Sequence, residues 1–502
     1  MKKIVLLLTV IMLFVFSITG LAVEKGGELE IGLDADPPML DPHLSTAMVD
    51  RQVFQSLYDT LIEIDENMEL VPGLAEDWTI EEDGTRYVFE LREDVVFHDG
   101  SKFDAEAVEY NFERMLDSDF ASPRSSDLSL VKDFEVLDEY KIAVTLKEPF
   151  APFLATLADR AGMMVSPESA EEEGEDFANQ PVGTGPFKFV ERKVQEEIIL
   201  EKNEDYWKEG IPYLDRVVFR PFPDDNVRVL NLTDGDLDII DTVPPKDMEK
   251  LETETTVKLS NKNGLGFQGI WVNKEKKPLD NDKLARALSL SIDRKALVDT
   301  VFKDAAVPGN SPFPPGTTMH DKDQKVPEVD PVAAEKLLKE AGKSDGYKLK
   351  LMVESNPTVE QTAEVIQSMA SRVGIDVEIE LIEFGSMVDR LEKGDYQAAL
   401  LGWSGRVDPD GNTYRFFHSE GSMNESNYEN KEVDNILDKT REVTDNEERK
   451  KLFQEMMGEM NAELPYIFLY HPREISALKE EVKGFTPYPD GLFRLSEVWL
   501  ED

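Results

Sequence analysis

The middle of the chain holds a strand pattern followed directly by two helix patterns, and this arrangement constrains the fold most. Gly266–Asn273 is rich in β-branched, aromatic and glycine residues, which favours a strand close to a cleft. Asp280 is expected to cap the first helix, and Asp293 the second. Apolar residues recur at helical spacing between them, at Leu284, Ala287, Leu288 and Ile292. We therefore expect one strand and two amphipathic helices here.

The sequence after this segment alternates between helix and strand patterns. Residues 349–353 and 375–381 alternate apolar and polar side chains as strands do, and a helical pattern lies between them. Tyr396–Gly402 is almost wholly apolar, as a strand inside a sheet would be. Alternation of this kind predicts an α/β architecture. Ligands of such sheets gather beyond the strand ends, so the segment after Gly402 is expected to line a binding site.

The segment that follows Gly402 carries the side chains of a recognition site. It offers an aromatic ring, a guanidinium group, carboxylates and an amide on one loop. A second candidate is the proline-rich loop 37–46, because rigid loops at strand ends commonly face ligands. The predicted ligand-binding residues are Ser45, Thr46, Trp403, Ser404, Arg406, Asp408, Asn412 and Tyr414.

The start of the chain has the composition of a signal peptide. Lys2 and Lys3 precede an apolar run over residues 4–16, and small residues suitable for cleavage stand at 20–22. No later run approaches the roughly 18 apolar residues of a membrane span. The chain has no cysteine, which excludes disulfides, thiolate metal sites and lipid attachment to a cysteine. An exported protein without that lipid is expected in a periplasm.

Length and charge bound the remaining possibilities. A chain of 502 residues is too long for one core, and its 40% hydrophobic content can fill two or three. The formal net charge is −48, or −50 without Lys2 and Lys3, and this repels nucleic acid and anionic lipid surfaces. We interpret the charge as a solvated acidic surface, suited to high external salt.

Three sequence runs carry a resemblance to a known family. They are GLAEDW at 73–78, FHDGSKFDAEAV at 97–108 and NFERML at 111–116. Together with the central strand, its PLDN turn and the double helix, they make the chain resemble family 5 of the extracellular solute-binding proteins. That family includes dipeptide, oligopeptide and nickel receptors of ABC importers. The resemblance implies that the inserted subdomain holding these runs supports the first lobe rather than touching ligand.

The resemblance also implies a division of the chain. We expect an α/β, two-lobed periplasmic-binding-protein fold with a subdomain inserted in the first lobe and a hinge of two crossing segments, at about 266–273 and 471–477. The expected parts are a signal peptide at 1–22, lobe I at 23–64, 182–268 and 476–502, the inserted subdomain at 65–181, and lobe II at 269–475.

Motifs for other chemistries are incomplete. The GxGxxG string at Gly264–Gly269 leads into a strand, whereas a dinucleotide site needs it to open a helix. Gly402–Arg406 resembles a hydrolase nucleophile elbow, but Arg406 replaces the last glycine. Asp408, Asp410 and Asn412 suggest an EF-hand without its glycine and glutamate, so an Asx turn is favoured. The five histidines are scattered, which disfavours a dedicated metal site and a nickel receptor.

The residues expected to select the ligand differ from those of dipeptide receptors. Such receptors place an aspartate three residues after the tryptophan, where this chain has Arg406, and an arginine about fifty residues earlier, where it has Val353 and Glu354. A peptide ammonium group would meet Arg406 at a cost of several kcal/mol. Either longer peptides bind through their main chain, or the ligand presents an anionic or hydroxyl-rich group to Arg406 and Trp403.

These features predict a periplasmic substrate-binding protein that passes a small solute, with a peptide as the main expectation, to an ABC permease in the inner membrane. The alternatives are an oligosaccharide, an opine-like compound or a metal chelate as ligand, or a secreted hydrolase, for which the sequence offers no persuasive nucleophile. We expect a monomer without cofactor, metal or nucleic-acid partner.

Overall fold

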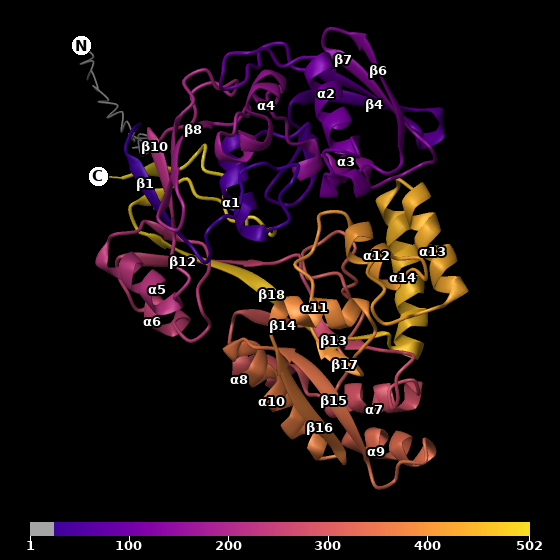
Figure 1. The fold of residues 1–502 in the computed structure, drawn as a ribbon. Coiled ribbons are helices and arrows are strands. Elements are labelled where there is room, and N and C mark those ends of the chain that lie inside the picture. The colour runs from indigo at the N-terminus through magenta and orange to yellow at the C-terminus, as the bar shows by residue number, and fades with distance from the viewer. Residues whose placement is uncertain (1–24, 502) are drawn as a thin grey trace, which may run out of the picture.

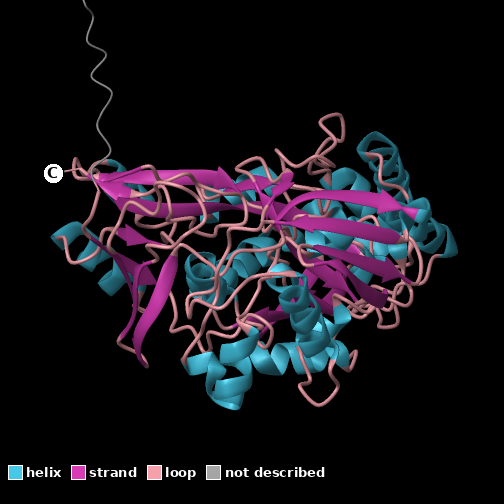
Figure 2. Ribbon diagram, turned by 90° about the horizontal axis from the view of Figure 1, so that it is seen from above, coloured by secondary structure: helices cyan, strands magenta, loops and turns pink. Residues whose placement is uncertain are grey.

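The computed structural model describes residues 25–501, so the predicted signal peptide at 1–22 lies outside the described residues. Two lobes are joined by extended strands, and a further unit packs on the first lobe (Figure 1). This is the two-lobed α/β fold that the sequence predicts. The strands form separate sheets with helices packed beside them (Figure 2).

Lobe I is built on a mixed sheet in which β1 (Glu28–Leu33) runs parallel to its two neighbours, β10 and β11. β1 alternates toward a core that contains Phe54 of α1 and Phe219 of β10. The other elements of the lobe are α1 (Met48–Leu57), β8 (Phe187–Lys193), β9 (Glu197–Lys202), β10 (Arg216–Pro221), α5 (Asp225–Asp234), β11 (Ile239–Ile240), α6 (Met248–Glu252), β12 (Val257–Asn263), β19 (Val482–Lys483) and β20 (Trp499–Leu500).

The inserted subdomain has its own antiparallel sheet, ordered β4-β5-β7-β6, and its own core. α2 (Ala105–Leu116) covers this sheet, and Asp104 caps it by accepting a hydrogen bond from Ala107 N, as the sequence predicts. A short hairpin, β2 (Ile62–Ile64) and β3 (Leu70–Pro72), leads into the sheet. Its strands and other α-helices are β4 (Ala75–Glu81), β5 (Arg86–Leu91), β6 (Val131–Asp138), β7 (Lys141–Leu146), α3 (Phe153–Thr156) and α4 (Pro167–Glu173), and one of its 3₁₀ turns is η3 (Arg160–Gly162).

Two segments cross between the lobes. β18 (Tyr466–Lys479) is one continuous strand that pairs with β12 in lobe I and with β13 (Gln268–Val272) in lobe II. The pairing changes from one lobe to the other at Asn263–Gln268 on one segment and at Tyr470–Arg473 on the other. The two crossing segments are therefore confirmed, a few residues before the positions predicted for them.

Lobe II continues the sheet in the order β16-β15-β17-β13-β18. β15 (Tyr347–Glu354) pairs in parallel with β16 (Ile375–Ile382) and with β17 (Ala398–Leu400). Helices cover the sheet: α7 (Asp282–Ser291), α8 (Arg294–Val301), α9 (Pro331–Glu340), α10 (Pro357–Ser371) and α11 (Phe384–Glu392). β14 (Ala306–Pro308) adds to β18. The chain leaves β17 toward lobe I and forms η5 (Pro409–Asn412), α12 (Tyr414–Phe417), α13 (Lys431–Glu442) and α14 (Asn446–Glu463).

Local sequence signals placed the helix starts well, with one error. Asp293 and Asp330 cap α8 and α9 as predicted. Asn281, not Asp280, caps α7, because its side chain accepts from Lys283 N while Asp280 N donates to Lys276 O within the preceding turn. The strand predicted over 396–402 is shorter, since only Ala398–Leu400 pair on both sides.

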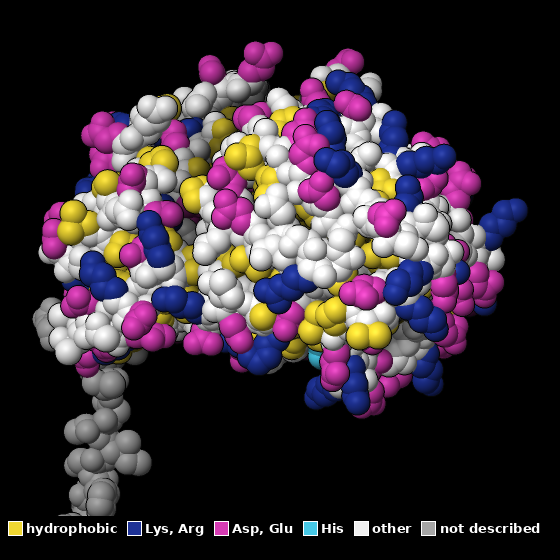
Figure 3. All heavy atoms as spheres, turned by 90° about the horizontal axis from the view of Figure 1, so that it is seen from below, with side chains coloured by type: hydrophobic (Ala, Val, Ile, Leu, Met, Phe, Trp, Pro, Cys, Tyr) yellow, Lys and Arg dark blue, Asp and Glu magenta, His cyan; other side chains and the backbone are white. Residues whose placement is uncertain are grey.

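Charged side chains are widespread on the face shown in Figure 3, where acidic and basic ones are interspersed among uncharged and hydrophobic ones.

Candidate functional site

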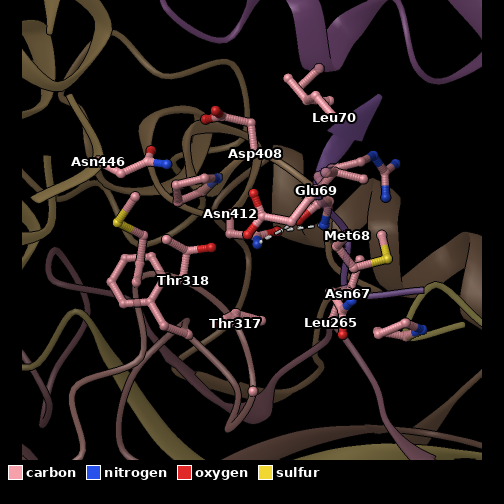
Figure 4. A pocket seen from close by; sticks show the side chains of 18 of the residues that line it. Asn67, Met68, Glu69, Leu70, Leu265, Thr317, Thr318, Asp408, Asn412 and Asn446 are labelled. Carbon is pink, nitrogen blue, oxygen red and sulfur yellow. Dashed lines mark hydrogen bonds between the residues drawn. The ribbon is translucent and has the colours of Figure 1, made fainter. Parts of the chain in front are cut away.

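A cavity of about 580 Å³ lies between the inserted subdomain, the crossing segments and lobe II. Its subdomain wall is the turn of the β2–β3 hairpin with part of α3, and its lobe II walls are loop 313–319, loop 406–412 and the start of α14. In Figure 4, Asp408, Asn446 and Thr318 lie across from Asn67, Met68 and Leu70. This volume is in the range of sites that enclose a small organic ligand.

The loop after β17 reaches this cavity because glycines let it lie directly on the crossing segment. Trp403 and Phe267 exchange two backbone hydrogen bonds, of 2.9 and 3.0 Å. A Cβ atom on Gly405, whose φ is +87°, would lie 2.3 Å from the backbone of Leu265, and one on Gly266 would lie 2.5 Å from the carbonyl oxygen of Trp403. Only glycine permits this approach. The loop is thereby fixed to the point where the lobes meet.

Asn412 organises the same loop from inside. Its Oδ1 accepts from Trp403 Nε1 at 3.1 Å and from Arg406 N at 2.8 Å, and its Nδ2 donates to Arg406 O at 3.1 Å. The residue is only 4% exposed. Asn412 therefore holds Trp403 and Arg406 in one arrangement.

Two carboxylates of the loop are used in ion pairs within lobe II. Asp408 receives both Nη atoms of Arg449 at 2.8 Å, and Asp410 receives Nε and Nη2 of Arg441 at 2.7 and 3.0 Å. Asp408 also accepts from Asp410 N at 2.8 Å as the cap of η5, which confirms the predicted Asx turn. Among residues 25–501, no group of three acidic or histidine side chains is placed to hold a metal ion.

Arg406 presents a positive charge at the cavity wall. Its guanidinium lies 4.3 Å above the Trp403 ring and donates to Gly405 O at 2.6 Å. Burial, followed by the charge of Arg51, lowers the pKa of Arg406 to about 9, so the group stays protonated at neutral pH. The loop thus brings a cation, stacked on an aromatic face, to the cavity.

The structure brings together only part of the predicted site. Arg406, Asp408 and Asn412 line the cavity. Trp403 lies behind Arg406 and packs edge-on against Phe416. The ligand-binding roles of these residues remain predictions.

The other predicted residues lie outside the cavity lining. Ser404 is exposed, and Tyr414 stacks on His418 with its ring 3.2 Å from the Arg441 guanidinium carbon. Ser45 is buried and donates to Asp50 at 2.6 Å, whereas Thr46 is exposed. Their contact with ligand is still a prediction, which the geometry does not test.

Several lining residues were missed at the sequence level. The β2–β3 turn, Asn67–Leu70, has an ordinary turn sequence and carries no ligand signal. Loop 313–319 does carry a sequence signal for ligand binding, because its Phe-Pro-Pro-Gly run indicates a rigid loop like the one at 37–46. The inserted subdomain was expected to support lobe I only, and instead it forms one wall of the cavity.

The two sides of the cavity also touch directly. Ala151 N of the subdomain donates to Arg441 O of α13 at 2.7 Å, and the Arg441 guanidinium lies 5.4 Å from the Phe150 ring. Lys262 Nζ on the crossing segment donates to Glu66 O of the subdomain at 3.3 Å. The walls of the cavity are thus in contact at its edges.

Comparison with known proteins agrees with this geometry. The sequence matches the family described as "Bacterial extracellular solute-binding proteins, family 5 Middle" over residues 69–424. The chain belongs to this family. Family 5 proteins are periplasmic solute-binding components of ABC importers, and not enzymes, so the predicted fold, family and receptor role are confirmed.

Individual family 5 proteins resemble the whole chain. The glutathione-binding protein GsiB of Pectobacterium atrosepticum is 30% identical over 92% of each chain. Heme-binding protein A of Haemophilus influenzae is 31% identical over 87% of this chain and 85% of its own. The structure of DppA from Helicobacter pylori, in complex with peptide STSA, superposes with a TM-score of 0.83 and 31% identity, over 95% of this chain and 99% of that one.

No helix within residues 25–501 has both the length and the apolar character needed to cross a membrane.

Proposed function

We propose that this family 5 protein captures a peptide or a peptide-like solute in the 580 Å³ cavity and delivers it to an ABC permease in the inner membrane. The observation that carries the proposal is the cavity itself, which is walled by the inserted subdomain, the crossing segments and lobe II together. A solute held there would touch both lobes at once and would favour the closed arrangement over an open one.

The crossing segments supply a hinge for this cycle. β12, β13 and β18 are extended strands that connect the lobes, and the subdomain meets lobe II through few polar contacts, such as Ala151 N to Arg441 O. Rotation at the crossing can therefore separate the walls without unfolding either lobe. The permease would recognise the closed form.

A peptide is favoured among the possible solutes. One compared protein is named for glutathione, a tripeptide, and the DppA structure is in complex with STSA, a tetrapeptide. The cavity volume suits ligands of this size. The signal-like residues 1–22 support export to the periplasm. We further propose that the protein acts as a monomer, and its charge of −48 disfavours nucleic acid as a partner.

The test is to identify and measure the ligand. Native mass spectrometry of the purified protein is expected to detect a retained solute, and pools of di- to pentapeptides are expected to raise the melting temperature. At a ligand concentration a hundred times Kd, binding stabilises the folded protein by about 2.7 kcal/mol. Small-angle scattering should show compaction by the same pool. A protein that neither gains stability nor compacts with any pool would contradict the proposal.

A further inference from the structure

Four arginines interact where lobe I, the subdomain and lobe II converge, and one of them, Arg406, lines the cavity. They are Arg51 of α1, Arg160 of η3, and Arg406 and Arg415 of lobe II, and we call them the arginine cluster. The charges of the other three act on Arg406. The guanidinium carbons of Arg406 and Arg415 both lie over the Trp403 ring, at 4.3 and 5.6 Å from its centre. Such a gathering of positive charge stands out in a chain whose net charge is −48.

One carboxylate, that of Asp159, interacts with three of these arginines. Its Oδ1 lies 3.1 Å from Arg51 Nη2 and 3.9 Å from Arg160 Nε. Burial pushes the pKa of Asp159 upward, but Arg51, Arg160 and Arg406 outweigh burial and hold that pKa well below its usual range. Asp159 therefore supplies one negative charge to three positive ones.

Two further carboxylates interact with Arg160, and both have other partners. Asp127 pairs with Arg124 at 2.8 Å. Asp50 accepts from Ser45 Oγ at 2.6 Å, and burial raises its pKa to about 6. In the described part of the chain, Arg406 and Arg415 have no carboxylate within the 4.0 Å of an ion pair. The cluster therefore keeps an excess of positive charge.

Hydrogen-bond donors of the cluster are also left over. Arg51 and Arg160 are 8% and 4% exposed, and the Nε atom of each is buried without a hydrogen-bond partner among residues 25–501. Buried donors normally have acceptors, because an unsatisfied one loses its hydration without compensation. Residues 25–501 thus supply no acceptor to these two Nε atoms and no carboxylate to Arg406.

Two arginines close to Arg406 in lobe II have carboxylate partners of their own. Arg449 and Arg441, close by in lobe II, are each held by both oxygens of their own aspartate. Among residues 25–501, Arg406 has no such partner, and its guanidinium donates to Gly405 O and Ser404 Oγ. The contrast favours a role of Arg406 in binding an external anion.

We propose that the solute carries a carboxylate, which binds the arginine cluster through Arg406, while its apolar part lies in the cavity against residues such as Met68, Leu154 and Phe313. This inference rests on the proposed receptor function and specifies its ligand class. It also explains why Arg406 stands where dipeptide receptors are expected to have an aspartate: the site receives the anionic group of the solute and not an ammonium group.

The test compares peptides that differ only in charge. Two tetrapeptide pools are titrated by calorimetry into the wild type, into Arg406→Gln and into Arg372→Gln. One pool has glutamate side chains and a free carboxyl terminus, and the other has glutamine and a carboxamide. Arg372 is exposed at the end of α10, so its replacement removes the same charge from lobe II away from the cavity. Melting temperatures of the free proteins show that each variant folds.

The wild type and Arg372→Gln are expected to bind the acidic pool at least about tenfold more tightly than the amide pool. In Arg406→Gln the ratio should fall to about one. Equal binding of both pools by the wild type, or an unchanged preference in Arg406→Gln, would overturn the anionic-ligand inference and leave the receptor function intact. Binding of neither pool at about 1 mM would refute the peptide function itself, and this inference with it.

Discussion

Replacing Asn412 by alanine should destabilise lobe II measurably, because one buried amide holds the loop through three hydrogen bonds. They join it to Trp403 Nε1, Arg406 N and Arg406 O, at 3.1, 2.8 and 3.1 Å. A typical intramolecular hydrogen bond contributes about 1 kcal/mol net, and a donor left buried without a partner costs about 1–3 kcal/mol. We expect Asn412→Ala to lower the free energy of unfolding by about 3 kcal/mol.

The measurement is urea denaturation of wild type and variant, without ligand, followed by circular dichroism. Asn446→Ala is the matched control, since Asn446 lines the same cavity but is exposed, and its side chain makes no hydrogen bond within the described residues. Its replacement should change stability by no more than about 0.5 kcal/mol. The reasoning would be refuted if Asn412→Ala were as stable as the wild type, or if the two variants lost equal stability.

Two further predictions concern β18 and the loop after β17 that packs on the crossing segment. Gly405→Ala should weaken ligand binding and lower the free energy of unfolding by on the order of 1–3 kcal/mol, because the φ of +87° and the Leu265 backbone leave no room for a Cβ atom. Gly458→Ala should instead raise the free energy of unfolding by up to about 1 kcal/mol, because no atom lies near its Cβ position inside α14. Equal melting temperatures of the two variants would contradict this reasoning. Burial, and then the charge of Asp490, raises the pKa of Glu474 in β18 from 4.5 to about 7. Glu474 therefore binds its proton more tightly in the folded protein than in the unfolded chain, and it should add stability as the pH falls from about 7 to 4.5. Glu474→Gln should lose that pH-dependent gain, and unfolding curves with parallel pH profiles in both proteins would disprove the assignment.

Most of the secondary structure could be predicted because its causes lie within a few residues. Asp104, Asp293 and Asp330 each bond a backbone N–H three residues ahead, so the cap is visible in the sequence. At α7 two adjacent residues, Asp280 and Asn281, could each cap, and the geometry of the preceding turn decided between them. Sequence signals of this kind place an element but not its last residue.

The candidate site could be predicted only in part, because its members come from distant segments. The loop after β17 was found from its chemistry, and Arg406, Asp408 and Asn412 do line the cavity. The partner of Asp408 is Arg449, 41 residues later, so its engagement in an ion pair was not visible in the loop sequence. The same holds for the wall formed by the β2–β3 turn, whose sequence is that of an ordinary hairpin.

The sequence alone determined the family, the order of helices and strands, and the presence of an arginine where dipeptide receptors are expected to have an aspartate, since these follow from local patterns and spacings. Only the tertiary structure decided what surrounds that arginine. Crossing strands bring Phe267 against Trp403, and chain folding carries Arg51 and Asp159 of the first half of the chain toward Arg406. Charge interactions depend on distance in space, which the order of residues along the chain does not give.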